Sequence, residues 1–310
     1  MYFNSKKVAF SRHESFVLRF GWLTKGFRAF EEDLNIFNNK DAVVTLGVGK
    51  NMVNSIRHWL RASKLIIFDT DKKETTSIGK AIFSKEDGWD PFLEDEATIW
   101  LIHWLISTNS EHATAWYWFF NHFYKPEFST DEVVSALSTF AKEKINARFA
   151  ISSIKQDAAV LLRSYVRSKK SKKAVYEDVL DSPLSLLKLI SYSTATKSYQ
   201  SKLEIRENLP IGIFGYAICD YLKQLNISQV PIEDLIYCKE GRVAPGLIFR
   251  LTENSLLTKL EQLIQLFPEK FAIDQTAGIH QFFVLNELDN LDPFEMLKFH
   301  YDSKNKYEAA

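Results

Sequence analysis

The sequence predicts a mainly α-helical protein that begins with a winged helix-turn-helix. A glycine suited to a tight turn, Gly47, is followed six and nine positions later by Val53 and Ile56, the spacing at which a second helix packs on a first. The hydrophobic pattern then changes from helical to extended at about Lys64. Most of the remaining chain carries apolar residues at helical spacing, which predicts a helical region and a C-terminal helix-plus-short-strand unit.

Length and composition limit the protein class. A chain of 310 residues is long enough for two or three domains. The 39 basic and 39 acidic side chains cancel, so any affinity for nucleic acid must come from a local patch. Two cysteines are too few for a disulfide framework, and no apolar run reaches the ~20 residues of a membrane helix. We expect a cytoplasmic protein with no membrane partner, divided into a winged-helix domain, an aromatic-rich helical domain and a C-terminal subdomain over residues 1–90, 91–230 and 231–310.

The first elements surround the turn at Gly47. Alternating apolar residues within Phe10 to Phe30 predict a strand or a tight helix-strand junction, and a short amphipathic helix is expected from Glu31 to Phe37. The helix expected to meet DNA runs from Asn51 to Lys64. The packing position Val43 is larger than is ideal there, a mild departure from the motif.

One face of this predicted helix is cationic. On a helical wheel the apolar residues share one side, and Lys50, Asn54, Arg57, Arg61 and Lys64 share the other. The cations suit phosphate contacts, while hydrogen-bonding groups beside them suit base edges. The hydrogen-bonding candidates are Asn51, Asn54, Ser55 and His58. The alternative is a solvated helix face without a ligand, or a winged helix used for protein contact.

A β-hairpin wing is predicted after the helix. Leu65 to Phe68 reads as a strand, Asp69 to Glu74 as a charged tip, and Ile78 to Phe83 as the returning strand. Further on, Asp90 and Pro91 predict a helix start. Ser129, with Glu132 three residues later, predicts a capping box.

The C-terminal third is also predicted to be mainly helical. Ile211 to Leu225 predicts one helix, and Arg242 to Leu251 a brief extended segment. A strongly periodic helix follows, carrying leucines from Leu256 to Leu263. This order predicts the helix-plus-short-strand unit that closes the fold.

Other residues are candidates for chemistry. The neighbours His13 and Glu14, followed by Arg19 and Lys25, could bind a phosphate or activate a water; the alternative is a buried hydrogen-bonded pair that fixes the N-terminal segment. Acidic residues that include Asp90, Glu94 and Asp95 could hold Mg²⁺ or Mn²⁺, but they also suit helix capping. The loop from Arg167 to Lys173 adds possible phosphate contacts at Lys169 and Lys170. We interpret His103, His112 and His122 as core or surface residues.

Four phrases resemble one known family along nearly the whole chain. They are SRHESFVLRFGWLTKGF, LGVGKNMVNSIRHWLRA, DPFLEDEATIWLIHW and APGLIFRL, and they resemble the family of domain of unknown function 4007 in order and spacing. That family usually has threonine where Ser15 stands and often tyrosine where Phe92 stands. The resemblance implies a component of bacterial DNA phosphorothioation and phage-defence systems, which act with a cysteine desulfurase, a reductase-like sulfur-transfer protein and an ATPase.

The resemblance also implies an activity. One member is understood to nick one DNA strand so that sulfur can enter the backbone, and the first places to look for such a centre are His13, Glu14, Arg19 and Lys25, or the acids Asp90, Glu94 and Asp95. The leading hypothesis is therefore a DNA-binding subunit with a metal-dependent nicking activity. The alternatives are a non-catalytic adaptor that recruits double-stranded DNA to the sulfur-transfer partners, and a transcriptional regulator of the same gene cluster.

Overall fold

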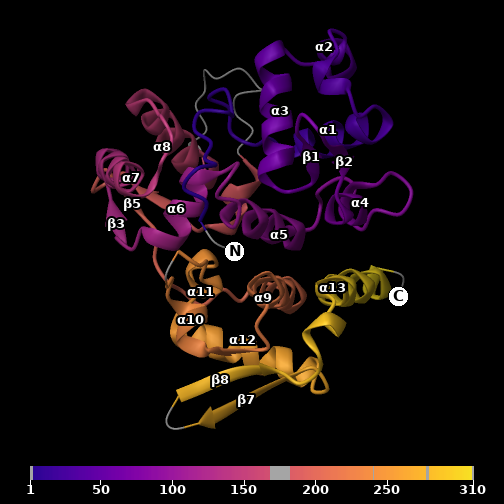
Figure 1. The fold of residues 1–310 in the computed structure, drawn as a ribbon, viewed down its shortest axis with the longest axis vertical. Coiled ribbons are helices and arrows are strands. Elements are labelled where there is room, and N and C mark those ends of the chain that lie inside the picture. The colour runs from indigo at the N-terminus through magenta and orange to yellow at the C-terminus, as the bar shows by residue number, and fades with distance from the viewer. Residues whose placement is uncertain (1–2, 168–181, 240, 277–278, 309–310) are drawn as a thin grey trace. The chain divides into compact units, whose positions relative to one another are not determined.

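The chain forms two compact units in the computed structural model (Figure 1). The described residues are 3–167, 182–239, 241–276 and 279–308. The larger unit comprises Asn4–Phe119 and Phe123–Lys202, and the smaller comprises Met1–Phe3, Phe120–His122 and Leu203–Ala310. Both are mainly helical with small antiparallel sheets, as expected.

This division has no boundary near residue 90. The reason is that residues after 100 hold the C-terminal end of the predicted DNA-binding helix. Asn109 donates hydrogen bonds from Nδ2 to the carbonyls of Arg61 and Ala62, at 3.0 and 2.9 Å. Lys64 donates to Thr108 Oγ1 at 2.8 Å. The segments before and after residue 90 therefore belong to the same compact unit.

The first helix lies where a strand or junction was expected. α1 spans Phe20–Glu32 and buries Leu23, Phe27 and Phe30, which recur at intervals of four and three residues. The alternation that suggested a strand lies mostly before this helix. The predicted helix from Glu31 to Phe37 is wrong as a separate element, because its start ends α1 and its end enters the 3₁₀ turn η1 (Ile36–Asn38).

Two helices flank Gly47, and the second begins and ends within two residues of the helix predicted from Asn51 to Lys64. α2 (Ala42–Leu46) ends at Gly47, whose φ of 60° lies in the left-handed region that favours glycine. α3 (Lys50–Ala62) follows and buries Val53 and Ile56. α3 packs so closely on α1 that a Cβ at Gly26 would lie 2.3 Å from Ile56 Cγ2.

A short hairpin follows α3, and then a helix replaces the expected returning strand. β1 (Ile66–Phe68) and β2 (Lys73–Thr75) pair antiparallel, with Ile66 opposite Thr75. The chain then enters α4 (Ser77–Phe83), because Thr76 caps it by accepting a hydrogen bond from Gly79 N at 3.1 Å. Isoleucines four residues apart at 78 and 82 are buried at helical spacing, so the strand prediction for this segment is wrong.

Among its described residues, the rest of the larger unit contains four longer helices and a three-stranded sheet, and the last three residues of one of these helices, Phe120–His122, belong to the smaller unit. The helix predicted to start at Asp90 begins later, because Asp95 is the cap of α5 (Glu96–Ser107). The capping box at Ser129 and Glu132 is confirmed at the start of α7 (Thr130–Lys144). The other elements are α6 (Thr114–His122), α8 (Ile151–Tyr165), η3 (Pro183–Leu187), and β3 (Glu127–Phe128), β4 (Ser191–Ser193) and β5 (Ser198–Gln200), which form a sheet in the order β3-β5-β4.

The smaller unit packs helices with a second three-stranded sheet. The segment expected to be extended, Arg242 to Leu251, instead contains α11 (Pro245–Ile248), where a proline occupies the first helical turn. The periodic helix around Leu256 is confirmed as α12 (Glu253–Leu266). The remaining elements are α9 (Ile211–Leu225), β6 (Gln229–Pro231), α10 (Ile232–Ile236), β7 (Phe271–Thr276), β8 (Ile279–Val284), η4 (Leu288–Asn290) and α13 (Pro293–Glu308), with strand order β6-β8-β7.

Among the described residues, no helix combines the length and the apolar character that a bilayer span requires.

Candidate functional site

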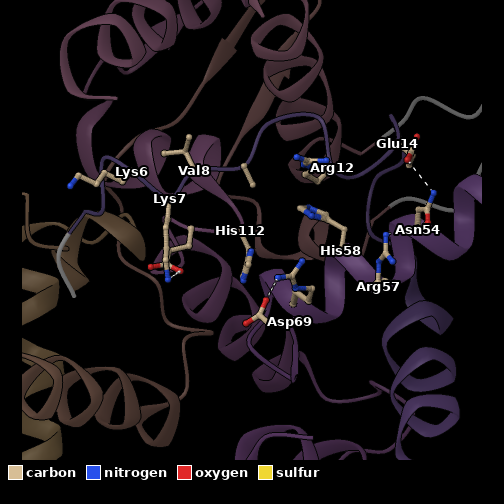
Figure 2. A pocket seen from close by; sticks show the side chains of 13 residues that line it. Lys6, Lys7, Val8, Arg12, Glu14, Asn54, Arg57, His58, Asp69 and His112 are labelled. Atoms are coloured by element: carbon tan, nitrogen blue, oxygen red, sulfur yellow. Dashed lines mark hydrogen bonds and ion pairs between the residues drawn. The ribbon is translucent and has the colours of Figure 1, made fainter. Parts of the chain in front are cut away.

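The larger unit contains a hollow of about 590 Å³, which we call the basic hollow (Figure 2). Its walls come from the N-terminal segment, from α3, from the tip of the β1–β2 hairpin and from the residues that follow α5. Its charged lining residues are the cations Lys6, Lys7, Arg12, Arg57 and Arg61 and the acids Glu14, Asp69 and Glu111. With its two histidines neutral, the lining carries a net positive charge.

A chain of polar contacts fixes the α3 wall. Asn54 donates from Nδ2 to Glu14 Oε1 at 3.3 Å and accepts from Arg57 Nη2 at 3.4 Å. The guanidinium of Arg57 also lies 5.6 Å from the centre of the Phe68 ring. One turn further on, Arg61 forms an ion pair with Asp69 at 2.5 Å. These contacts hold two arginines at the hollow in defined positions.

The cations are close enough to disturb one another. Burial lowers the pKa of Arg57, and the positive charges of Arg61 and Arg12 lower it further against the opposing effect of Glu14. Burial also holds the pKa of His58 well below its usual value, helped by neighbouring histidines and arginines. His58 is therefore neutral at pH 7. An anion placed in this hollow would relieve the repulsion among the arginines.

His112 gives the larger unit a pH-dependent stability. Burial first and the charge of Arg61 second lower its pKa from 6.5 to about 4. Between these two pH values the unfolded chain binds a proton at His112 that the folded protein does not, so stability falls as the pH falls through this window.

We expect urea midpoints to fall less steeply from pH 7 to pH 5 in His112→Gln than in the parent. All seven tryptophans lie in the larger unit, so their fluorescence reports its unfolding; equal slopes in the two proteins would contradict the prediction.

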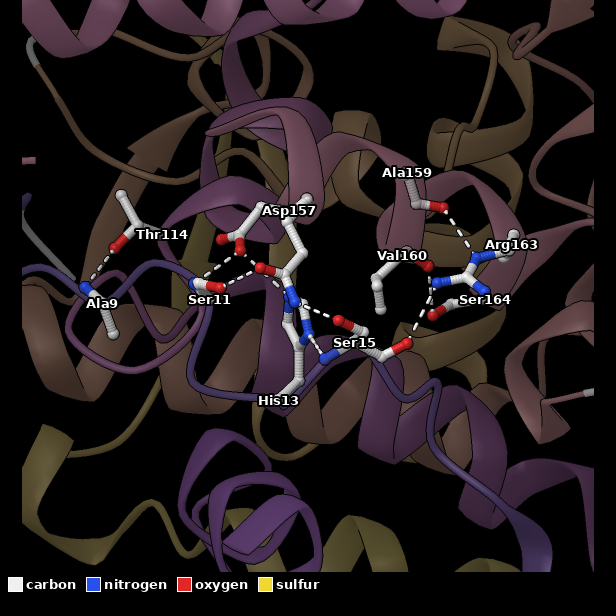
Figure 3. Close-up of polar contacts among 11 residues, drawn as sticks. Ala9, Ser11, His13, Ser15, Thr114, Asp157, Ala159, Val160, Arg163 and Ser164 are labelled. Carbon is white, nitrogen blue, oxygen red and sulfur yellow. Dashed lines mark hydrogen bonds and ion pairs between the residues drawn. The ribbon is translucent and has the colours of Figure 1, made fainter. Parts of the chain in front are cut away.

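The N-terminal wall is clamped to distant helices (Figure 3). His13 is 1% exposed, and its Nε2 lies 3.0 Å from Asp157 Oδ1 on α8, while Nδ1 accepts from Ser15 N at 3.2 Å. Ser11 N also donates to Asp157 Oδ1, at 2.6 Å. The backbone takes left-handed φ angles at Ser11, Glu14 and Ser15, of 61°, 50° and 67°. The contacts of His13 and Asp157 hold this strained segment in place, and with it Arg12 and Glu14 at the hollow.

The predicted DNA-binding residues divide into four groups. Four line the basic hollow, namely Asn54, Arg57, His58 and Arg61. Lys50 and Asn51 are exposed at the start of α3. Ser55 is fully buried, and Lys64, which does not line the hollow, donates to Thr108 beyond the end of α3. Because Ser55 faces the core, its expected contact with a base edge is not possible in this structure. Lys169 and Lys170 lie outside the described residues.

The structure does not bring the predicted catalytic residues together. His13 is buried against Asp157, and only Glu14 lines the hollow. Arg19 lies over the ring of Trp22, 5.2 Å from its centre, and Lys25 donates to the carbonyl of Leu46 at 2.9 Å. His13 does form a buried pair that fixes the N-terminal segment, but its partner is Asp157 and not the neighbouring Glu14.

Two of the three predicted metal ligands accept hydrogen bonds from backbone amides. Asp90 is buried, and its two carboxylate oxygens accept hydrogen bonds from the backbone amides of Glu94 and Asp95 at 2.8 and 3.1 Å. Asp95 caps α5 by accepting from Ala97 N. Across the described residues, no group of three histidine, cysteine, aspartate or glutamate side chains is placed to hold a metal ion. In this structure the carboxylates of Asp90 and Asp95 are therefore engaged with backbone amides.

Sequence reasoning missed much of the hollow. Lys6, Lys7 and Arg12 line it from a segment about 40 positions before α3, and His112 lines it from about 50 positions after. The consecutive lysines Lys6 and Lys7 were visible in the sequence as a basic pair. Their position at the hollow depends on the contact of the N-terminal segment with α8, which no local sequence pattern indicates.

Comparisons with known proteins identify the family. The model of the family described as "Protein of unknown function (DUF4007)" matches residues 10–301. A search of curated proteins found no match. Two solved structures are similar, "Magnesium ion-bound SspB crystal structure" at 25% identity and TM-score 0.83, and "SspB crystal structure" at 26% and 0.82. Each comparison covers 97% of this chain and 89% of the other. The chain therefore belongs to the DUF4007 family and shares its fold with SspB.

Proposed function

We propose that this protein is the DNA-binding subunit of a bacterial DNA phosphorothioation system, and that the basic hollow holds the sugar-phosphate backbone. The observation that carries the proposal is the convergence of five lysine and arginine side chains on one hollow of a chain whose total charge is zero. The membership in the DUF4007 family and the similarity to SspB support the assignment to such a system.

Arginine chemistry favours a phosphate as the ligand. A guanidinium presents paired N–H donors that match two oxygens of one phosphate. Arg57 is held in place by Asn54 and by the Phe68 ring, so little side-chain entropy is lost when it binds. A hollow of about 590 Å³ is large enough for a segment of backbone.

The elements around the hollow support a winged helix-turn-helix as the DNA-binding element. α2, the glycine turn and α3 follow in the required order, and the β1–β2 hairpin lies beyond α3 in the place of a wing. In this proposal the arginines of α3 contact phosphates, while the exposed Lys50 and Asn51 at its N-terminal end approach the bases.

The geometry supports an adaptor more directly than a nicking enzyme. The predicted catalytic residues do not converge, whereas the cations do. In the adaptor role the protein would recruit double-stranded DNA to the cysteine desulfurase, the reductase-like sulfur-transfer protein and the ATPase of the system. Nicking with Mg²⁺ or Mn²⁺, and binding to a single operator as a regulator, are distinct outcomes of the same experiment.

The test uses supercoiled plasmid and labelled duplexes of unrelated sequence. We expect binding to every duplex, with affinity that falls steeply as salt rises, because phosphate contacts release counterions. Conversion of plasmid to open circles only with Mg²⁺ or Mn²⁺ would identify a nicking subunit. Tight binding to one sequence alone would identify a regulator, and no binding at low salt would overturn the proposal.

A further inference from the structure

Arg61 uses only part of its hydrogen-bonding capacity. It lies in the last turn of α3, and its Nη2 contacts one oxygen of Asp69 at 2.5 Å. Its Nε is buried and has no hydrogen-bond partner among the described residues. Because Nε and Nη2 form one edge of the guanidinium, a group with two suitably spaced oxygens can accept from both. Asp69 leaves half of this edge unused.

A second nitrogen without a partner in the described residues lies three residues earlier on the same helix. His58 lines the basic hollow with 9% of its surface exposed, and its Nε2 is buried without a partner in the described part of the chain. Residues three apart are neighbours on a helix surface, so His58 and Arg61 lie side by side. A neutral imidazole has one N–H to donate. Leaving such groups without hydrogen bonds destabilises the free protein, and a ligand with acceptor oxygens would supply the missing hydrogen bonds.

The position of Asp69 allows a ligand to displace its side chain from Arg61. It lies at the exposed tip of the hairpin, with 58% of its side chain accessible, and each strand of the hairpin has three residues. Phe68, the residue directly before Asp69, packs its ring on Phe30 and Phe37, at 5.9 and 5.8 Å between centroids. The exposed side chain of Asp69 can therefore rotate away from Arg61 while Phe68 stays packed.

We propose that Arg61 and His58 form a phosphodiester subsite in the basic hollow, and that the Asp69 carboxylate occupies this subsite in the free protein. A DNA phosphate displaces Asp69 and accepts hydrogen bonds from both donors on the Arg61 edge and from His58. This inference rests on the proposed DNA binding. Asp69 then acts as an internal competitor that lowers the affinity of the free protein for DNA.

The test compares two substitutions on the same hairpin tip. Asp69→Asn removes the competitor, and Asp71→Asn makes the same change of charge at an exposed residue outside the hollow's lining. Because an exposed ion pair contributes up to about 1 kcal/mol, Asp69→Asn should tighten binding to a labelled DNA duplex by about threefold to fivefold. Asp71→Asn should change it less than about twofold, as expected of a remote charge.

A second pair of variants checks that the effect passes through Arg61. In an Arg61→Lys background, which keeps the charge but loses the paired edge, Asp69→Asn should have no larger effect than Asp71→Asn. His58→Gln should keep more affinity than His58→Leu, since it keeps a donor. Inorganic phosphate, added as competitor at constant ionic strength, should compete more effectively against the parent than against Arg61→Lys.

The outcomes separate the subsite from the proposed function. If the parent does not bind DNA, the proposed function and the subsite are both contradicted. If the parent binds DNA and Arg57→Ala weakens it, but Asp69→Asn matches Asp71→Asn, DNA binding stands and the subsite is wrong. An equal gain from Asp69→Asn in the Arg61→Lys background would also overturn the subsite, because the gain would then be a general effect of charge.

Discussion

Replacing Arg57 and Arg61 together by alanine should weaken DNA binding on the order of a hundredfold at low salt. Each arginine is expected to make at least one charge-assisted hydrogen bond to phosphate, and such bonds contribute about 1.5–3 kcal/mol each. The slope of log affinity against log salt should also become less steep by about one for each phosphate that the variant no longer binds. Fluorescence anisotropy over a range of salt concentrations measures both quantities.

The control for this variant is a pair of lysines outside the hollow. Lys142 and Lys144 lie exposed in the last turn of α7, and neither lines the basic hollow. Changing both to alanine removes the same two charges, so it corrects for the general effect of net charge on association. Equal losses in the two double variants would show that the hollow is not the DNA interface.

The second large effect concerns stability. Asp157→Ala should lower the free energy of unfolding of the larger unit by about 3–5 kcal/mol, because it breaks a buried pair and removes the acceptor of two hydrogen bonds. Asp157 accepts from Ser11 N and pairs with His13, and both His13 and Asp157 are buried. Burial raises the pKa of Asp157 against the opposing effects of its contacts with His13 and Ser11 N. Urea unfolding followed by tryptophan fluorescence gives the change.

Two further variants show whether the pair or its charge is responsible. Asp157→Asn keeps an acceptor oxygen, so it should cost less than Asp157→Ala. The double variant His13→Leu/Asp157→Leu removes both polar partners and should recover part of the loss. Glu143→Ala on exposed α7 is the surface control. A loss of under about 0.5 kcal/mol in Asp157→Ala, the size usual for surface substitutions, would contradict the clamp.

Local patterns predicted the helices around the turn but not the hollow. Gly47, Val53 and Ile56 could be placed from spacing alone, because the turn and the packing of neighbouring helices depend on nearby residues. α4 was missed because Ile78 and Ile82 fit a buried strand as well as a helix, and only the cap at Thr76 decides between them. The burial of Ser55 likewise depends on tertiary packing, which a helical wheel does not contain.

The sequence indicated only part of the candidate site, because local patterns do not contain tertiary packing. Arg57 and Arg61 were found because they belong to one periodic helix. Arg12 and Lys7 reach the hollow only because the N-terminal segment crosses to α6 and α8. The sequence left Asp90 open between a metal ligand and a helix cap, because a carboxylate that accepts two backbone amides and one that binds a cation look alike in sequence.

The clamp also determines when the hollow can exist during folding. Its contacts join residues far apart in sequence, with separations of 105 positions for Ala9 and Thr114 and 144 for His13 and Asp157. Closing such long loops costs entropy before any contact forms, so these pairings are expected late. A growing chain would complete the N-terminal segment and α3 well before α6 and α8, the helices to which that segment is bound. The protein should therefore acquire a complete hollow only after α8 has been synthesised, and an isolated fragment of residues 1–90 should lack it.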